Sequence, residues 1–200
     1  MLRIFLTVSV LFWNQLAAEK AVNEVIDFCQ DADCLEPVEA ILGKNYNELE
    51  FDFRQWIATD AYGDNIQDAV DFNLMKFFNY SRCGNVADTI VPISAPWGFR
   101  GYLENGTVQQ IFKVYTLIVP QVNDPPEPLD PTVKIGIGTP IWFYTRSFDH
   151  SFHPPEVKEL VTQFMGDLEK DNQPFNRTTF IIAVFNTLGL MEIGFEKIEQ

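Results

Sequence analysis

The chain has 200 residues, of which 46% are hydrophobic and 21% charged, and its formal net charge is −14. This length suits one domain with a sizeable core, and the composition is that of a folded globular protein, which excludes a disordered chain. Phosphate binding needs clustered Lys and Arg, whereas the 14 basic residues here are scattered singly, so neither nucleic acid nor an anionic membrane is an expected partner.

Residues 1–18 have the features of a secretory signal peptide. Arg3 gives a positive start, residues 4–13 are apolar, and Ala17 and Ala18 supply the small side chains of a cleavage site. A membrane span needs roughly 20 apolar residues, and no later window comes close to that length. The alternative, a buried first helix, is disfavoured because the segment has no polar face. We therefore expect a secreted, extracellular protein without a membrane span.

Residues 19–43 form an acidic lead-in that contains Cys29 and Cys34. In an oxidising compartment these cysteines can pair across a short loop, which stabilises folding by roughly 2 kcal/mol in the chain-entropy model. A metal site at the two cysteines is disfavoured, because no histidine is near. Cys83 is left over, and we expect a buried thiol there, with an intermolecular bridge as the alternative.

The first half of the remaining chain predicts a strand, a helix and two strands. Residues 45–54 nearly alternate apolar and polar side chains, as in a half-buried strand, and Trp56 and Ile57 extend the pattern. Asp64 is a good helix N-cap, and apolar residues recur at helical spacing through Tyr80. Two strands are expected over residues 88–95 and 107–119, joined by a loop that carries Gly98, Gly101 and Asn105.

The second half repeats this order after a proline-dense turn. Four prolines between Pro125 and Pro131 fix φ and remove backbone donors, so this segment is an ordered turn or a sheet edge. A strand over 141–148 leads to Pro154 and Pro155, which suit the first turn of a helix whose apolar stripe reaches Leu168. Two further strands are expected over residues 178–186 and 190–198.

Each half thus has the order β-α-β-β. We expect an α+β fold over residues 44–200, in which the duplicated β-α-β-β units form a twisted antiparallel β-barrel flanked by two α-helices.

Several short motifs in this order resemble the SOUL family of haem-binding proteins. They cover roughly residues 28–186 and comprise Cys29 and Cys34, Trp56-Ile57-Ala58-Thr59, Ile93-Ser94-Ala95-Pro96, Asp124-Pro125-Pro126 and Thr145-Arg146-Ser147-Phe148-Asp149. The resemblance implies the same duplicated fold, and it implies non-covalent binding of a tetrapyrrole in an apolar groove beside the first helix, without one family-wide axial histidine. The family usually has a glycine where this chain has His150.

The first helix offers residues for such a groove. Leu74, Met75, Phe77 and Phe78 present more apolar surface than one inward stripe needs, and methionine and phenylalanine adapt well to ring faces. Lys76 and Arg82 are the nearby cations for haem propionates, whereas Asp64, Asp68 and Asp71 oppose them and limit the affinity. The alternative reading is ordinary core, in a secreted structural or protein-interaction module that does not bind haem; the sequence identifies no protein partner.

His150 and His153 can ligate iron or a divalent metal, although two loop histidines are more often surface residues. The chain carries none of the common catalytic motifs, so we expect no enzyme and no catalytic residues. A hydrolase-like activity needs a buried carboxylate with a raised pKa, and Glu50 and Glu192 are the positions to inspect.

Three N-x-[ST] sequons begin at Asn79, Asn105 and Asn176, and with a signal peptide they predict a glycoprotein. Asn105 and Gly106 have the sequence of a type I′ turn, which puts this sequon at an exposed hairpin tip.

Overall fold

The computed structural model describes residues 37–52, 55–63, 66–148, 154–185 and 191–198. The signal peptide over 1–18, the pairing of Cys29 with Cys34, and the histidines His150 and His153 lie outside these ranges and stay predictions.

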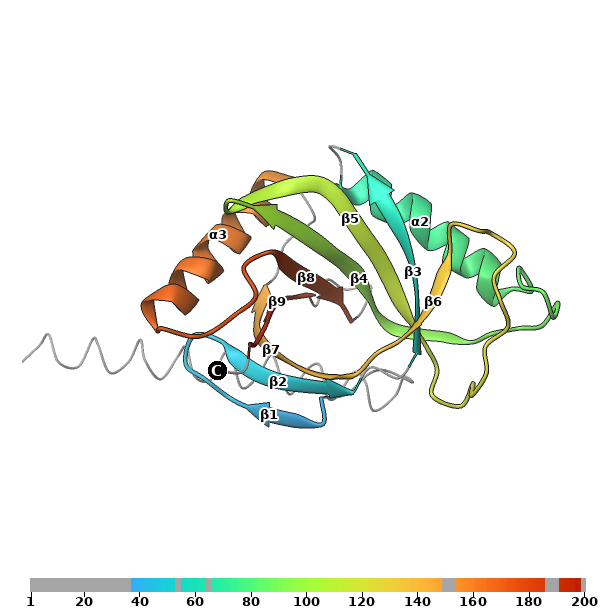
Figure 1. The fold of residues 1–200 in the computed structure, drawn as a ribbon, viewed down its shortest axis with the longest axis horizontal. Helices are drawn as coiled ribbons and strands as arrows, with labels where there is room; N and C mark the ends of the chain where they lie inside the picture. The colour runs from blue at the N-terminus through green and yellow to red at the C-terminus, as the bar shows by residue number, and fades with distance from the viewer. Residues whose placement is uncertain (1–36, 53–54, 64–65, 149–153, 186–190, 199–200) are drawn as a thin grey trace, which may run out of the picture.

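The described residues form one antiparallel sheet with the strand order β1-β2-β7-β9-β8-β4-β5-β3-β6 (Figure 1). Every neighbouring pair in this order is antiparallel. The strands are β1 (Glu39–Ile41), β2 (Asn47–Asp52), β3 (Gln55–Tyr62), β4 (Ile93–Glu104), β5 (Thr107–Ile118), β6 (Lys134–Ile137), β7 (Pro140–Phe148), β8 (Thr179–Val184) and β9 (Met191–Glu196).

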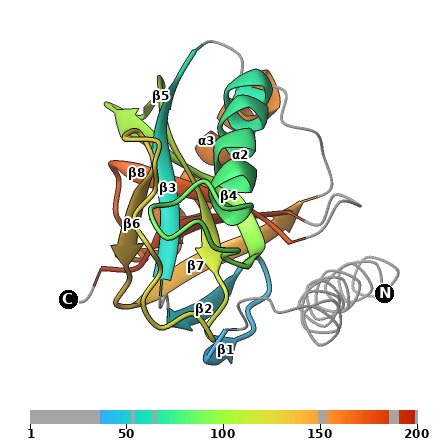
Figure 2. The same ribbon diagram turned by 90° about the vertical axis from the view of Figure 1, so that its right-hand side faces the viewer.

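Two helices, α2 (Ile66–Ser81) and α3 (Pro154–Lys170), lie on the same side of the sheet (Figure 2). Their inward residues are wholly buried: Val70 and Phe77 on α2, and Phe164 and Leu168 on α3, all have 0% exposure. These side chains belong to one core cluster with the sheet residues that face the helices, such as Phe99. The helices therefore close one face of the sheet and leave the other face for a different role.

The duplicated order is confirmed. The first unit is β3-α2-β4-β5 and the second is β7-α3-β8-β9, and in the sheet the two sets of three strands meet where β4 pairs with β8. The predicted closure into a barrel is not confirmed, because no pairing among the described strands joins β1 to β6 at the two ends of the order. Both end strands are short, of three and four residues, so the sheet stays open there. The proline-dense turn precedes β6, which is an edge strand. This agrees with the expectation from the sequence, because proline lacks the backbone N–H that a central strand needs.

Two boundaries in the first half differ from the sequence-based expectation. The single strand expected over 45–57 is two strands, β2 and β3, which pair with β7 and β5 respectively. The alternation of Leu49, Phe51 and Phe53 is interrupted by the adjacent polar residues Arg54 and Gln55, so extending one strand to Trp56 and Ile57 was wrong.

The expected loop at Gly98 and Gly101 is part of β4. A Cβ at Gly101 would lie 2.2 Å from the ring of Phe180, so this glycine serves close packing on the core and not a turn.

The hairpin between β4 and β5 is as predicted. Asn105 and Gly106 have φ of 50° and 75°, and positive φ at both central residues defines the type I′ turn.

Candidate ligand-binding surfaces

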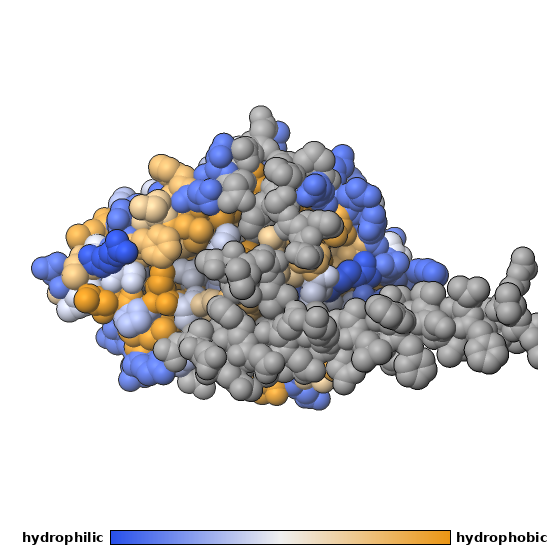
Figure 3. All heavy atoms as spheres, turned by 180° about the vertical axis from the view of Figure 1, so that it is seen from behind, coloured by the Kyte–Doolittle hydropathy of each residue, from blue (hydrophilic) through white to orange (hydrophobic). Residues whose placement is uncertain are grey.

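Three large side chains stand out of α2 into solvent: Phe72, Met75 and Phe78 are 68%, 58% and 44% exposed. A spacing of three residues places them along one side of the helix, and we call this set the α2 surface. Figure 3, which views the molecule from the helix side, shows apolar side chains mixed with polar ones over the region of α2. Exposed aromatic and methionine side chains grouped on one helix indicate a contact surface.

The residues predicted for the ligand wall divide between the two sides of α2. Met75 and Phe78 are exposed, whereas Phe77 is wholly buried in the core and Leu74 packs against it. Leu74 and Phe77 therefore support the helix from inside. Phe72, the most exposed of the set, is absent from the sequence-based prediction, although its distance of three residues from Met75 could have revealed it.

A hollow of about 650 Å³ opens beside Phe72, between α2 and the end of β3. Its lining includes Tyr62, which is 70% exposed, and Lys76. The Lys76 ammonium lies 5.3 Å from the centroid of the Phe72 ring and donates a hydrogen bond to the Thr132 hydroxyl at 3.0 Å. Asn73 also lines the hollow, and its buried side-chain oxygen has no hydrogen-bond partner. The hollow thus combines two exposed rings and one cation with the carboxylates of Asp60 and Asp68.

Charge around the α2 surface is mixed. Asp68 and Asp71 are exposed on the same helix, and Asp68 lines the hollow. Arg82, predicted as a cation for propionates, is exposed just after the last residue of α2. The aspartates disfavour an anion near the start of the helix, whereas Lys76 and Arg82 favour one nearer its end.

A second concavity, of about 420 Å³, lies on the face of the sheet away from the helices, and we call it the sheet cleft. One wall comes from β3, β4 and β5, and the other from β7, β8 and β9, so the two duplicated units face each other across it. Its lining includes Trp56, Ala58, Arg100, Tyr102, Lys113, Tyr115, Phe143, Ile181 and Glu196.

Glu192 on β9 is only 4% exposed, and burial raises the pKa of its carboxyl to about 7. The Ser147 hydroxyl donates a hydrogen bond to it at 3.4 Å, which lowers the pKa by a smaller amount. Glu192 therefore has the burial and the raised pKa that a hydrolase-like site requires, whereas Glu50 is half-buried. A serine beside a carboxylate lacks the third, orienting group of a nucleophile and base pair. Among the described residues, no group of three His, Cys, Asp or Glu side chains could hold a metal ion.

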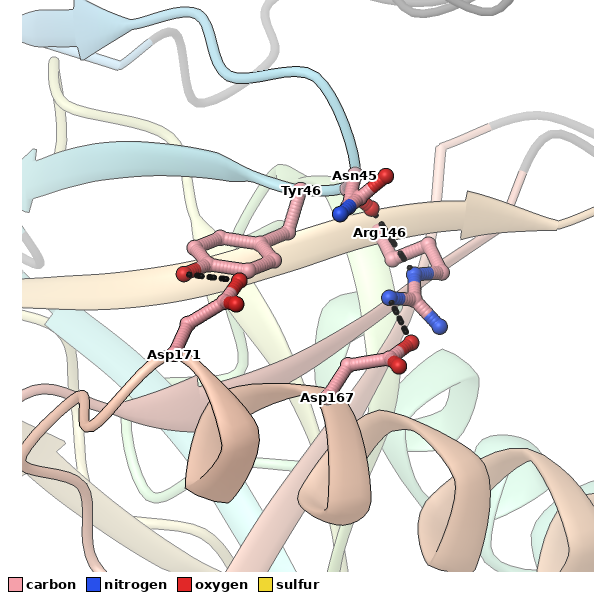
Figure 4. Close-up of polar contacts among 5 residues, drawn as sticks. All are labelled: Asn45, Tyr46, Arg146, Asp167 and Asp171. Carbon is pink, nitrogen blue, oxygen red and sulfur yellow. Dashed lines mark hydrogen bonds and ion pairs between the residues drawn. The ribbon is translucent and has the colours of Figure 1, made fainter.

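A polar cluster at the end of α3 has a structural role (Figure 4). Arg146 on β7 donates hydrogen bonds to Asp167 at 2.7 Å and to the Asn45 carbonyl at 3.0 Å, and Tyr46 donates to Asp171 at 3.2 Å. Burial, followed by the charge of Asp171, raises the pKa of Tyr46 to about 12, so its hydroxyl stays a donor. These contacts hold α3 against β2 and β7.

The sequons differ in accessibility. Asn79 and Asn105 are exposed, whereas Asn176 is half-buried and its side-chain oxygen accepts hydrogen bonds from the amide and hydroxyl of Thr178 at 2.9 and 2.7 Å. Cys83 is a free thiol and is half-buried, which is more accessible than the buried thiol expected from the sequence. No helix within the described ranges is both long enough and apolar enough to cross a membrane.

Comparison with known proteins gives one family. Residues 37–191 match the SOUL heme-binding protein family. No curated protein sequence matches the chain.

Solved structures with a similar fold have very different sequences. A hydrolase from Listeria innocua is 8% identical, with 77% of this chain and 92% of that chain covered and a TM-score of 0.49. The protein SAV2435, bound to tetraphenylphosphonium, is 9% identical over 77% and 94% of the two chains, with a TM-score of 0.45. A putative transcription regulation protein from Staphylococcus aureus MU50 is 9% identical over 78% and 99%, with a TM-score of 0.43. Likenesses at this level carry no argument about function.

Proposed function

The chain belongs to the SOUL heme-binding protein family, and from this premise we propose that it binds haem or another tetrapyrrole, non-covalently and without catalysing a reaction, at the α2 surface. The supporting observation is the hollow of about 650 Å³ beside Phe72, where two exposed rings lie together with the half-buried Lys76. A tetrapyrrole needs apolar contact for its face and positive charge for its propionates.

The α2 surface and the hollow beside it offer both apolar ring faces and a positive charge. Phe72 and Tyr62 supply ring faces on two sides of the hollow, and Met75 and Phe78 extend the apolar surface along the helix. Lys76 lies beside Phe72 and can turn from the Thr132 hydroxyl towards a propionate. Asp68 opposes that charge, so we expect a dissociation constant in the micromolar range, about −8 kcal/mol of binding free energy.

A titration with hemin, followed in the Soret band, tests the proposal. We expect a saturable change at micromolar concentrations, and Phe72→Glu and Met75→Glu should each weaken it by introducing charge and removing apolar contact. Val38→Glu is the matched control, since Val38 is also 68% exposed but precedes β1, away from α2. A titration without saturation, or equal binding by all three variants, would reject the α2 surface as the haem site.

The exposed side chains of α2 also suit a second function, a protein-interaction module that binds no haem. In that case hemin gives no saturable change, while a neutral environment-sensitive dye binds the folded protein and Phe72→Glu abolishes the dye signal.

We propose further that the protein is secreted after cleavage near Ala18, on the strength of the apolar segment that precedes this residue. Expression in mammalian cells and N-terminal sequencing of the protein in the medium test this. Protein retained in the cells with residues 1–18 intact would contradict it.

A further inference from the structure

The sheet cleft lies on the face opposite the one that the helices cover, so it is separate from the α2 surface. Small residues keep it open, because Ala58 and Gly138 occupy lining positions without filling them. Trp56 forms one of its walls, and its indole rests on Gly136, where a Cβ would lie 2.2 Å from the ring. This contact holds a large aromatic face at a fixed place in the cleft.

The cleft is lined by two cations, Arg100 and Lys113, and by one carboxylate, Glu196. Arg100 is half-buried, and in the described part of the chain it has no carboxylate partner within 4 Å. Its cross-strand neighbour on β5 is Lys113, whose ammonium reaches Asp60 only at 3.7 Å. Like charges directly opposite each other in a sheet are destabilising, so an anion between the two side chains would relieve that repulsion. Glu196, on the other wall, accepts a hydrogen bond from the neutral amide of Asn176 at 3.3 Å, and its own charge disfavours an anion on that side of the cleft.

Two phenol groups flank Arg100. Tyr102 follows it by two residues on the same face of β4, and Tyr115 is adjacent on β5. Within the ranges that the structure describes, neither hydroxyl has a hydrogen-bond partner. Burial raises the pKa of Tyr115 further above its ordinary value, so this hydroxyl stays protonated and can donate. Among the described residues, neither hydroxyl is one of the buried polar atoms without a partner, so both are accessible and can donate to a ligand in the cleft.

We propose that the sheet cleft binds a small planar aromatic carboxylate, with the carboxylate between Arg100 and Lys113 and the ring along Trp56. The Tyr115 hydroxyl donates to the second carboxylate oxygen. A volume of about 420 Å³ falls at the lower end of the roughly 300–1,000 Å³ found for ligand pockets, which suits one or two fused rings and is small for a tetrapyrrole. This site is independent of haem binding at the α2 surface.

Isothermal titration of the full chain with 2-naphthoate tests the proposal, with neutral 2-naphthamide as the ligand control. We expect saturable binding of 2-naphthoate and markedly weaker binding of the amide. Arg100→Met should weaken the binding of 2-naphthoate by about tenfold or more, because it removes a charge-assisted hydrogen bond while keeping an unbranched apolar stem. Tyr115→Phe should weaken it by a smaller factor. Lys158→Gln, which removes an exposed cation on α3, and Met75→Glu on the α2 surface should leave it unchanged.

Three results would each overturn the proposal: no binding of 2-naphthoate up to about 5 mM, equal binding of the amide, or unchanged affinity in Arg100→Met. If Arg100→Met does not fold, the comparison of the two ligands on the unaltered protein and the Tyr115→Phe variant decide the question. Loss of hemin binding by Met75→Glu with retained 2-naphthoate binding would separate the two sites.

Discussion

The buried carboxyl of Glu192 gives a quantitative prediction for stability against pH. Folding raises its pKa from 4.5 to about 7, because burial disfavours the ionised form. The folded state therefore binds the proton more tightly than the unfolded state, and the protein loses stability as pH rises through this interval. At about 1.4 kcal/mol for each pH unit, the loss between pH 5 and pH 8 is about 2.5 kcal/mol. Above about pH 8 both states are ionised and the contribution becomes constant.

Glu192→Gln removes this titration while keeping the shape of the side chain and an acceptor for the Ser147 hydroxyl. We expect urea unfolding, followed by tryptophan fluorescence from pH 5 to pH 8, to show the variant gaining about 2.5 kcal/mol relative to the unaltered protein. Glu50→Gln, at a half-buried position on β2, is the control for losing one negative charge from a chain of net charge −14.

Ser147→Ala gives an independent check, because the hydrogen bond from Ser147 lowers the pKa of Glu192. Its removal should raise that pKa and extend the loss of stability to higher pH. A free-energy difference between Glu192→Gln and the unaltered protein that does not change with pH would refute the reasoning, and so would a change of equal size in Glu50→Gln.

Three further predictions concern the fold. Phe77→Ala should lower the free energy of unfolding in urea by about 3–5 kcal/mol and Phe78→Ala by less than about 1 kcal/mol, because only Phe77 is wholly buried. Similar losses in the two variants would contradict the assignment of the two sides of α2. Arg146→Met should lower the free energy of unfolding by about 1–2 kcal/mol. It removes the contact with Asp167 and the stacking on Phe164, whose ring centroid is 4.5 Å from the guanidinium. A variant as stable as the parent would show that α3 does not depend on this contact. Gly106→Ala should destabilise the protein by about 1 kcal/mol, because alanine is strained at the φ of 75° found there. Gly166→Ala, at an exposed position of α3 where nothing lies within 4 Å of the added Cβ, should stabilise it by about 0.5–1 kcal/mol. Melting temperatures that move in the same direction in both variants would contradict the backbone argument.

The repeated β-α-β-β order was predictable because it depends on local signals. Apolar side chains at helical spacing define α2 and α3, and the Asn105-Gly106 pair sets its own turn through positive φ. The break between β2 and β3 has only a weak local signal, the adjacent polar residues Arg54 and Gln55, whereas the different partners of the two strands are set by long-range pairing. The pairing of strands and the closure of a sheet into a barrel both depend on contacts between residues far apart in the sequence.

The candidate sites were likewise predictable only where the signal in the sequence is local. Four apolar residues among the five positions 74–78 reveal that α2 has two apolar sides, but only packing shows that Phe77 is core and Met75 is exposed. The sheet cleft left no signal in the sequence, because Arg100 and Lys113 lie on neighbouring strands and look like solitary surface cations. Glu192 was open to prediction as a carboxylate within an apolar strand, yet its burial and raised pKa depend on β7 and β8 beside it.

We predict that a glycan at Asn79 would compete with the proposed ligand for the same side of α2. Asn79 is exposed and lies four residues after Met75, so a glycan on it would project over the α2 surface. We therefore expect that protein secreted from mammalian cells with Asn79 occupied binds hemin more weakly than its Asn79→Gln variant, by about tenfold or more. Asn105→Gln is the matched control, since its sequon is equally exposed but lies at the β4–β5 hairpin.

Mass spectrometry of the secreted protein establishes occupancy, and a Soret titration measures binding. With both sequons occupied, equal affinity in the two variants would mean that hemin binds somewhere other than the α2 surface. With only Asn105 occupied, the surface is free, and the Asn79→Gln variant should then match its parent. Both outcomes follow from one geometric fact, that Met75 and Asn79 are neighbours on successive turns of one helix.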